Sequence, residues 1–187
     1  MPKIIDEEAV FAAVLGVLIS RGYENATTQA LAAAAQIHEA TLFRKYESKA
    51  RLIERAVAQQ LATTPLSRVR YSGDLRADLL AIVAAYAATS AQHGEILPIL
   101  LLEAPRHPEL RDAFQAPLAN IQKLVDILAR YQHEGLLREE PPLTSISALL
   151  GPLMVSAMFR RAAVDLPPPA IDVDEHVRAF LHGRLPG

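Results

Sequence analysis

Apolar residues recur at three- and four-residue steps along almost the whole chain of 187 residues. In residues 9–21, for example, Val10, Val14 and Leu18 fall on one face of a helix. No run of alternating apolar and polar residues is long enough to predict a strand that is buried on one face. The spacing therefore predicts an all-α fold.

Glycine, prolines and capping side chains mark the ends of the expected helices. Gly22 is expected to stop the first helix, because glycine readily takes the left-handed conformation that follows a helix C-terminus. Thr27 and Ser48 are expected N-caps. Residues 63–74 break the periodicity, and the three prolines at 167–169 cannot continue a helix. The sequence predicts about nine helices, over residues 9–21, 27–35, 38–46, 48–62, 75–92, 95–104, 109–134, 143–165 and 172–182.

The composition excludes several kinds of chemistry. Without cysteine, the chain has no disulfide, no Cys-ligated zinc, no iron–sulfur cluster and no thiol nucleophile. The sequence has no phosphate-cradling glycine loop and no strand–turn–helix setting for a nucleophilic serine. Glu103 and His107 have the i,i+4 spacing of two metal ligands, but Pro105 and Pro108 interrupt that helix. We therefore expect no catalytic residues, no metal site and no cofactor, and hence no enzyme.

The lengths of the apolar stretches and the charges near the N-terminus also indicate where in the cell the protein is found. The most apolar stretches, residues 9–19, 96–102 and 148–159, are shorter than the roughly 18–20 residues that span a bilayer. Acidic residues occupy positions 6–8, where a secretory signal peptide needs a positive flank. We expect a cytoplasmic protein with no membrane partner. The net charge of −2 argues neither for nor against nucleic acid, so any such argument must be local.

Residues 27–49, with the sequence TTQALAAAAQIHEATLFRKYESK, carry the most specific pattern. A capped short helix, a turn near Gln36, a second short helix and a basic start to a third have the spacing of a helix-turn-helix. Five basic residues also fall within the twelve positions from Arg44 to Arg55. The alternative is an amphipathic helical hairpin inside an ordinary bundle, with a merely solvated basic face.

In a helix-turn-helix the second helix, here about residues 38–46, lies in the major groove and reads base edges. Thr27, at the start of the first helix, and Lys49, one helix after the second, would instead contact phosphates and fix the register. The candidate DNA-binding residues are Thr27, Gln29, His38, Glu39, Ala40, Thr41, Phe43, Arg44, Lys45 and Lys49.

The order of residues over about 10–52 also matches a known pattern. It runs through RGY at 21–23, Thr27, LAAAA at 31–35, TLFR at 41–44, Tyr46, Ser48, Lys49 and Leu52. In this order the segment resembles the TetR family of bacterial repressors. Gln36 stands at the turn where that family usually has glycine, so the turn must either change its geometry or strain another residue.

The resemblance implies a three-helix N-terminal DNA-binding domain, residues 1–48, and a helical ligand-binding and dimerisation domain, residues 49–187. It further implies a ligand-responsive repressor that binds a palindromic operator in double-stranded DNA as a homodimer. The effector would be a small, hydrophobic molecule. The alternative is a helical small-molecule-binding protein or enzyme without a DNA function. A third possibility is a protein–protein adaptor whose N-terminal domain no longer binds DNA.

The resemblance also suggests where the effector would bind, although each apolar candidate could equally be plain core. The candidate pocket residues are Tyr86, Leu97, Leu101, Phe114, Leu118, Ile121, Gln122, Val125, Met154 and Met158.

Overall fold

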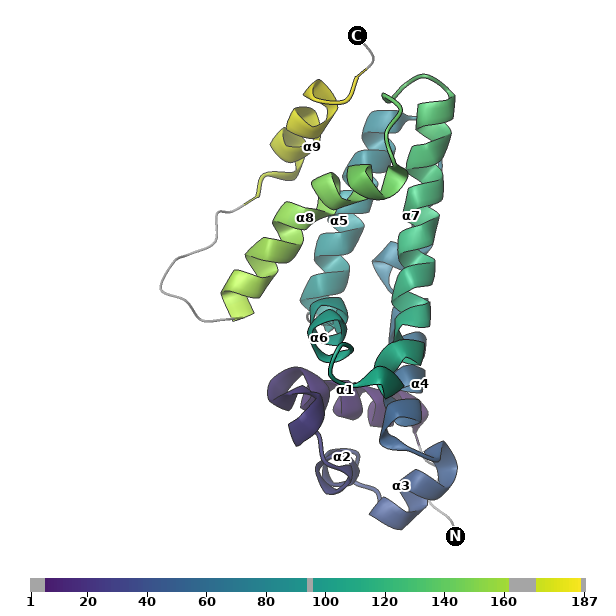
Figure 1. The fold of residues 1–187 in the computed structure, drawn as a ribbon, viewed down its shortest axis with the longest axis vertical. Coiled ribbons are helices and arrows are strands. Elements are labelled where there is room, and N and C mark those ends of the chain that lie inside the picture. Colours follow the sequence, from purple (N-terminus) through teal and green to yellow (C-terminus); the bar gives the residue numbers. More distant parts are fainter. Residues whose placement is uncertain (1–5, 94–95, 162–170, 186–187) are drawn as a thin grey trace. The chain divides into compact units, whose positions relative to one another are not determined.

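A computed structural model describes residues 6–93, 96–161 and 171–185. Within these ranges the chain forms nine α-helices, two 3₁₀ helices and no strand, which confirms the predicted all-α fold. The elements are α1 (Glu7–Asn25), α2 (Thr28–Ala34), α3 (Glu39–Tyr46), α4 (Lys49–Ala62), η1 (Pro65–Arg68), α5 (Leu75–His93), α6 (Ile96–Glu103), η2 (Pro108–Phe114), α7 (Gln115–His133), α8 (Pro142–Arg161) and α9 (Val173–His182) (Figure 1). The expected helix end at 162–165 and the prolines at 167–169 lie outside the described residues.

The helices divide between two compact units. The first runs to Thr63 and takes up His93–Leu118, so it holds α1 to α4, α6 and η2. The second takes up Thr64–Gln92 and the chain from Ala119 on, with η1, α8, α9 and most of α5 and α7. The helix α4 therefore packs with the three N-terminal helices. The predicted division after residue 48 concerns which part binds DNA and which binds ligand, and it stays a prediction.

The core of the first unit gathers the apolar face predicted on α1. Val10, Val14 and Leu18 are buried there, together with Leu31 of α2 and Leu42 of α3. Burying a leucine side chain fully contributes roughly 1.5–3 kcal/mol, so these contacts hold the three short helices together.

Gly22 interrupts α1 with a kink. The helix continues to Asn25, but Gly22 has φ 73° and ψ 173°, a conformation that only glycine adopts readily. After the bend, the N–H of Ala26 donates to the carbonyl of Gly22 at 3.1 Å. The regular helix therefore stops at Gly22, as predicted, and a second short helical segment follows it to Asn25.

The turn between α2 and α3 closes with a left-handed residue. The N–H of Gln36 donates to the carbonyl of Ala33, and that of Ile37 to the carbonyl of Ala32, each at 3.1 Å. This pair of bonds is a Schellman C-cap, whose left-handed position glycine usually fills. Gln36 occupies it with φ 55°, so the turn keeps its geometry and strains a residue that has a side chain.

Both predicted N-caps are confirmed. The hydroxyl of Thr27 accepts the N–H of Ala30 at 3.1 Å, and that of Ser48 accepts the N–H of Arg51 at 3.2 Å. Each bond satisfies one of the N–H groups that a helix start leaves without an intrahelical partner. These caps fix where α2 and α4 begin, and therefore how much chain is left for α3 between them.

The predicted helix over 109–134 begins as a 3₁₀ helix. Residues Pro108–Phe114 form η2, and α-helical structure starts only at Gln115. A proline has no N–H, so Pro117 cannot donate the α-helical bond to the carbonyl of Ala113. The α-helix is therefore not continuous across this point.

A buried carboxylate ties the loop before α5 to α7 in the second unit. Asp78 is only 4% exposed and accepts hydrogen bonds from the N–H and hydroxyl of Ser72 and, at 2.5 Å, from the hydroxyl of Tyr131. Burial would raise the pKa of Asp78, but the bonds from Ser72 and Tyr131 outweigh it, so the pKa lies below its ordinary value. These bonds hold the non-helical segment before α5, which lies within the residues 63–74 where the apolar periodicity is broken.

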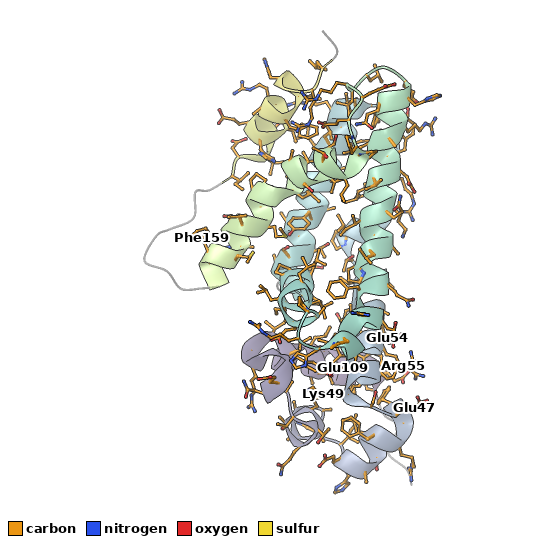
Figure 2. The ribbon with its side chains drawn as sticks, in the orientation of Figure 1. Glu47, Lys49, Glu54, Arg55, Glu109 and Phe159 are labelled. Atoms are coloured by element: carbon orange, nitrogen blue, oxygen red, sulfur yellow. The ribbon has the colours of Figure 1, made fainter. Side chains whose placement is uncertain are left out.

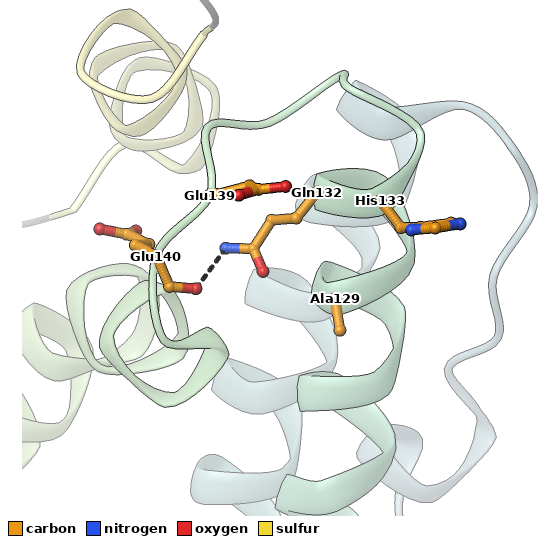
Figure 3. Close-up of a pocket in the computed structure, with 5 residues that line it drawn as sticks. All are labelled: Ala129, Gln132, His133, Glu139 and Glu140. Carbon is orange, nitrogen blue, oxygen red and sulfur yellow. Dashed lines mark hydrogen bonds between the residues drawn. The ribbon is translucent and has the colours of Figure 1, made fainter.

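A second carboxylate joins the α7–α8 loop to the chain end after α9. Glu140 accepts hydrogen bonds from Ser145 at 2.5 Å, Arg184 at 2.7 Å and Arg138 at 2.9 Å. Its backbone carbonyl also accepts the side-chain amide of Gln132 at 3.0 Å, at the edge of an open, polar pocket (Figure 3).

This carboxylate predicts a pH dependence of stability. The hydroxyl of Ser145, then Arg138 and Arg184, lower the pKa of Glu140 to about 2 in spite of its burial. Ionised Glu140 therefore stabilises the fold above its ordinary pKa of 4.5, and this contribution is lost as the pH falls towards 2. We expect Glu140→Gln to lower the free energy of unfolding by on the order of 1 kcal/mol at pH 7 and by less than about half of that at pH 3. Urea denaturation at both pH values measures this, and an equal loss at both would contradict it.

One described helix is long and apolar enough to cross a membrane by length and composition alone. It covers Pro142–Arg160 of α8, and 39% of that span is buried inside the protein. It is longer than the apolar stretch of residues 148–159 on which the sequence expectation rested. A core helix passes the same test, so α8 is weak evidence for a membrane span.

Candidate DNA-binding site

The helix α3 has one face fixed in the core and the other turned outward. Leu42 and Tyr46 are buried and hold the helix in the first unit. Of the predicted residues on this segment, Thr41 and Phe43 are half-buried. The exposed ones are His38, Glu39, Ala40, Arg44 and Lys45. The structure thus gathers polar and basic side chains on the outer face of one short helix.

The start of α2 holds the two predicted residues that precede the turn. Thr27 and Gln29 are both exposed. Because the hydroxyl of Thr27 already accepts the Ala30 N–H, it can offer a phosphate its own O–H as a donor.

Lys45 is held by a residue far away in the sequence. Its Nζ lies 2.9 Å from Oε1 of Glu7, which also accepts the hydroxyl of Tyr46 at 3.1 Å. Glu7 was not among the predicted site residues. The signal for it was only the acidic run at positions 6–8, which the sequence does not connect to α3.

Lys49, at the start of α4, is half-buried, and its side chain contacts Tyr23. Its Nζ donates to the backbone carbonyl of Tyr23 and lies 3.8 Å from the centroid of that ring. Burial lowers the pKa of Lys49, while nearby carboxylates, Glu109 first, oppose that shift. Lys49 thus has one of its three N–H donors already in use before any phosphate contact.

Tyr23 connects this corner to α6 and η2 within the first unit. Its N–H donates to Oε1 of Glu103 at 3.2 Å. Burial and a hydrogen bond with Glu109 raise the pKa of its hydroxyl to about 12. Figure 2 shows Lys49 and Glu109 near one another at this corner. Tyr23, the residue directly after Gly22, thus contacts three other elements, α4, α6 and η2.

His107 lies beside the same tyrosine, with the ring centroids 4.5 Å apart. Its buried Nε2 has no hydrogen-bond partner, and the carboxylates of Glu24, Glu103 and Glu109 stand 3.7–3.8 Å from the ring nitrogens. Among the described residues, no group of three or more His, Asp or Glu side chains is arranged to hold a metal ion. Glu103 and His107 both contact Tyr23, the first through the Tyr23 N–H and the second through the ring.

The ten candidate pocket residues are divided between the two units. Four lie in the first unit, namely Leu97, Leu101, Phe114 and Leu118, and six lie in the second, namely Tyr86, Ile121, Gln122, Val125, Met154 and Met158. None of them lines the open pocket of Figure 3, whose walls are Ala129, Gln132, His133, Glu139 and Glu140. Their common role in ligand binding stays a prediction.

Comparison with known proteins assigns this fold. Residues 11–56 match the family described as bacterial regulatory proteins, tetR family, and residues 69–179 match the tetracyclin repressor-like C-terminal domain. The chain belongs to the TetR family. An HTH-type transcriptional regulator of Mycobacterium bovis is 28% identical over 169 residues, which are 89% of this chain and 80% of the relative.

Solved structures of the TetR fold superpose on the chain. The fatty acid degradation regulator FadR from Bacillus halodurans has a TM-score of 0.76 at 15% identity, covering 94% of this chain and 98% of FadR. AibR, solved with isovaleryl coenzyme A and operator DNA, has a TM-score of 0.68 at 17% identity, covering 95% and 96%. The protein is therefore a DNA-binding transcriptional regulator of the TetR family, as the sequence predicted.

Proposed function

We propose that this TetR regulator is a repressor that binds a palindromic operator as a homodimer, with α3 of each subunit in the major groove. The observation that supports this most is the two-sided character of α3. Leu42 and Tyr46 anchor it, and its outer face carries His38, Arg44 and Lys45. Two such helices must stand about 34–36 Å apart to enter successive major grooves on one side of a duplex.

The proposed contacts divide into two kinds. His38, Glu39, Ala40, Thr41 and Arg44 face base edges, because these residues occupy the first turns and the exposed side of α3. The phosphate contacts come from Thr27, Gln29, Lys45 and Lys49. Phe43 lies inside α3 and has neither a hydroxyl nor a free backbone N–H, so it offers the DNA only its ring. This division separates sequence preference from general affinity, so each kind has its own test.

The apolar surface of α8 supports the homodimer. Val155 and Phe159, one turn apart on α8, are 47% and 41% exposed (Phe159 is labelled in Figure 2). Adjacent apolar side chains that are left exposed support an interaction surface here. A second copy of the chain, docked through α8 and α9, would cover them and bring two copies of α3 to one operator.

A hydrophobic acyl compound is the proposed effector. AibR was solved with isovaleryl coenzyme A, and FadR is a regulator of fatty acid degradation. Apolar side chains make up eight of the ten candidate pocket residues once Tyr86 and Gln122 are set aside. An effector that favours one separation of the two α3 helices of the dimer changes operator affinity. The coupling free energy of such an effect is typically about 1–3 kcal/mol.

Selection of bound DNA from a random pool tests the proposal directly. We expect enrichment of a palindrome by the full-length protein, and loss of that enrichment when short-chain acyl coenzyme A is added. No enrichment over the starting pool would contradict the DNA-binding function. An enriched sequence without two-fold symmetry would contradict the homodimer, and retention of binding with every acyl compound would contradict the effector class.

The phosphate contact proposed for Lys49 makes a separate prediction. Lys49→Ala is expected to weaken binding to all sequences alike and to lower the slope of log affinity against log salt by about one. The control is Lys123→Ala, which removes an exposed lysine on α7. An unchanged slope would assign Lys49 to the fold alone, through its bond to the Tyr23 carbonyl.

A further inference from the structure

A carboxylate from α1, that of Glu7, binds two side chains in the last turn of α3. Oε1 of Glu7 lies 2.9 Å from Nζ of Lys45 and accepts the hydroxyl of Tyr46 at 3.1 Å. The side chains of Lys45 and Glu7 keep 37% and 47% of their surface exposed, so solvent and DNA can reach the pair. The two residues are 38 positions apart in the sequence, and only the fold brings them together.

The position of Glu7 is fixed from both ends. Asp6 caps α1 by accepting the N–H groups of Glu8 and Ala9 at 3.1 and 3.2 Å. One turn further, the buried ring of Phe11 packs against the ring of Tyr46 at 5.6 Å. Because both rings belong to the core, the first turn of α1 is held against α3. The backbone of Glu7 is therefore already positioned near Lys45, which lowers the entropy cost of forming their ion pair.

The charges agree with this geometry. The hydrogen bonds from Lys45 and then Tyr46 lower the pKa of Glu7 below its ordinary 4.5, so Glu7 is ionised at neutral pH. The same bond raises the pKa of Lys45. The lysine charge is therefore balanced by a carboxylate that stands beside the surface proposed to face DNA phosphates.

We propose that Glu7 is a positioning residue that withholds Lys45 from the DNA backbone and so lowers the affinity of α3 for every sequence. This inference rests on the proposed function, in which α3 lies in the major groove. A lysine that contacts a phosphate releases about one counterion, and the paired carboxylate of Glu7 offsets the charge with which Lys45 would do so. Glu7 thereby weakens sequence-independent binding without touching the base-reading side chains.

Two neighbouring glutamates provide a matched experiment. Glu7→Gln and Glu8→Gln make the same change in net charge, but Glu8 is exposed and its carboxylate has no hydrogen bond or ion pair among the described residues. Affinity for the selected operator and for an unrelated duplex is measured for both variants between about 50 and 200 mM salt.

We expect Glu7→Gln to bind both duplexes about two- to fivefold more tightly than Glu8→Gln at the low-salt end, with a salt slope steeper by about one. In a Lys45→Gln background the difference between the two variants is expected to vanish. Equal affinities and slopes for the two variants, or weaker binding by Glu7→Gln, would overturn the inference. If the unmodified protein and all variants fail to bind DNA, the proposed function itself fails, which is a distinguishable result. Equal thermal midpoints of the two variants exclude loss of folding as the cause.

Discussion

Replacing both Thr41 and Arg44 with alanine is expected to abolish the preference for the operator over unrelated DNA. Both residues lie on the outer side of α3, and Arg44 is exposed there. A good contact between a side chain and a base edge discriminates by about 1–3 kcal/mol, so the loss of two corresponds to roughly 30-fold or more in specific affinity. Binding to unrelated DNA changes far less, because phosphate contacts supply most of it.

Titration of the variant with the operator and with a scrambled duplex of equal length measures both affinities. Arg111→Ala is the charge control, since Arg111 is exposed on η2 and lies outside the helix-turn-helix. Alanine is the strongest helix former, so the double variant is expected to keep α3 intact. Sequence preference retained by the double variant would contradict the outer face of α3 as the reading surface.

The sequence predicted the N-terminal part of the fold well because its signals are local. Thr27 and Ser48 cap helices that begin one residue later, and Val10, Val14 and Leu18 repeat within the window that a single helix spans. Capping and apolar periodicity act over a few residues, so they can be interpreted without knowledge of the tertiary structure. The exposure of the predicted face of α3 followed from the same periodicity.

The remaining features depend on contacts between distant segments. The bond between Glu7 and Lys45, and the bond from Lys49 to the Tyr23 carbonyl, join different helices of the first unit. The segment after Gly22 is another example. Glycine predicts the end of the regular helix, but the second short helical segment that follows to Asn25 could not be predicted from the local pattern. The candidate pocket residues, which are divided between two units, stay untested for the same reason.

The second large effect is expected at this bend, where Gly22→Ala should destabilise the first unit. A residue with a side chain at φ 73° and ψ 173° costs about 1–3 kcal/mol. An added Cβ would also stand 3.0 Å from Oε1 of Glu103, closer than ordinary contact. We expect the thermal midpoint to fall by at least several degrees, because about 1 kcal/mol shifts a chain of this size by roughly 2–4 °C. Operator affinity is expected to fall with it, because the bend carries Tyr23.

Gly16 on the same helix provides the matched control. It is exposed, and a Cβ added there meets nothing within 4 Å, so Gly16→Ala is expected to stabilise the helix by up to about 1 kcal/mol. Two substitutions of the same kind in α1 thus have opposite expected signs. Equal effects would contradict the assigned bend.

Removal of Glu103 separates the two causes of the Gly22 effect. Glu103→Ala on its own leaves the N–H of Tyr23 without its acceptor, which costs about 1 kcal/mol or more. In that background Gly22→Ala has no carboxylate to displace, so the destabilisation that remains measures backbone strain alone. A double-mutant cycle by urea denaturation gives the difference. If Gly22→Ala costs the same with and without Glu103, the side chain yields freely and the conformation of Gly22 accounts for the whole effect. A smaller cost without Glu103 instead means that the close fit between the bend and α6 requires a glycine.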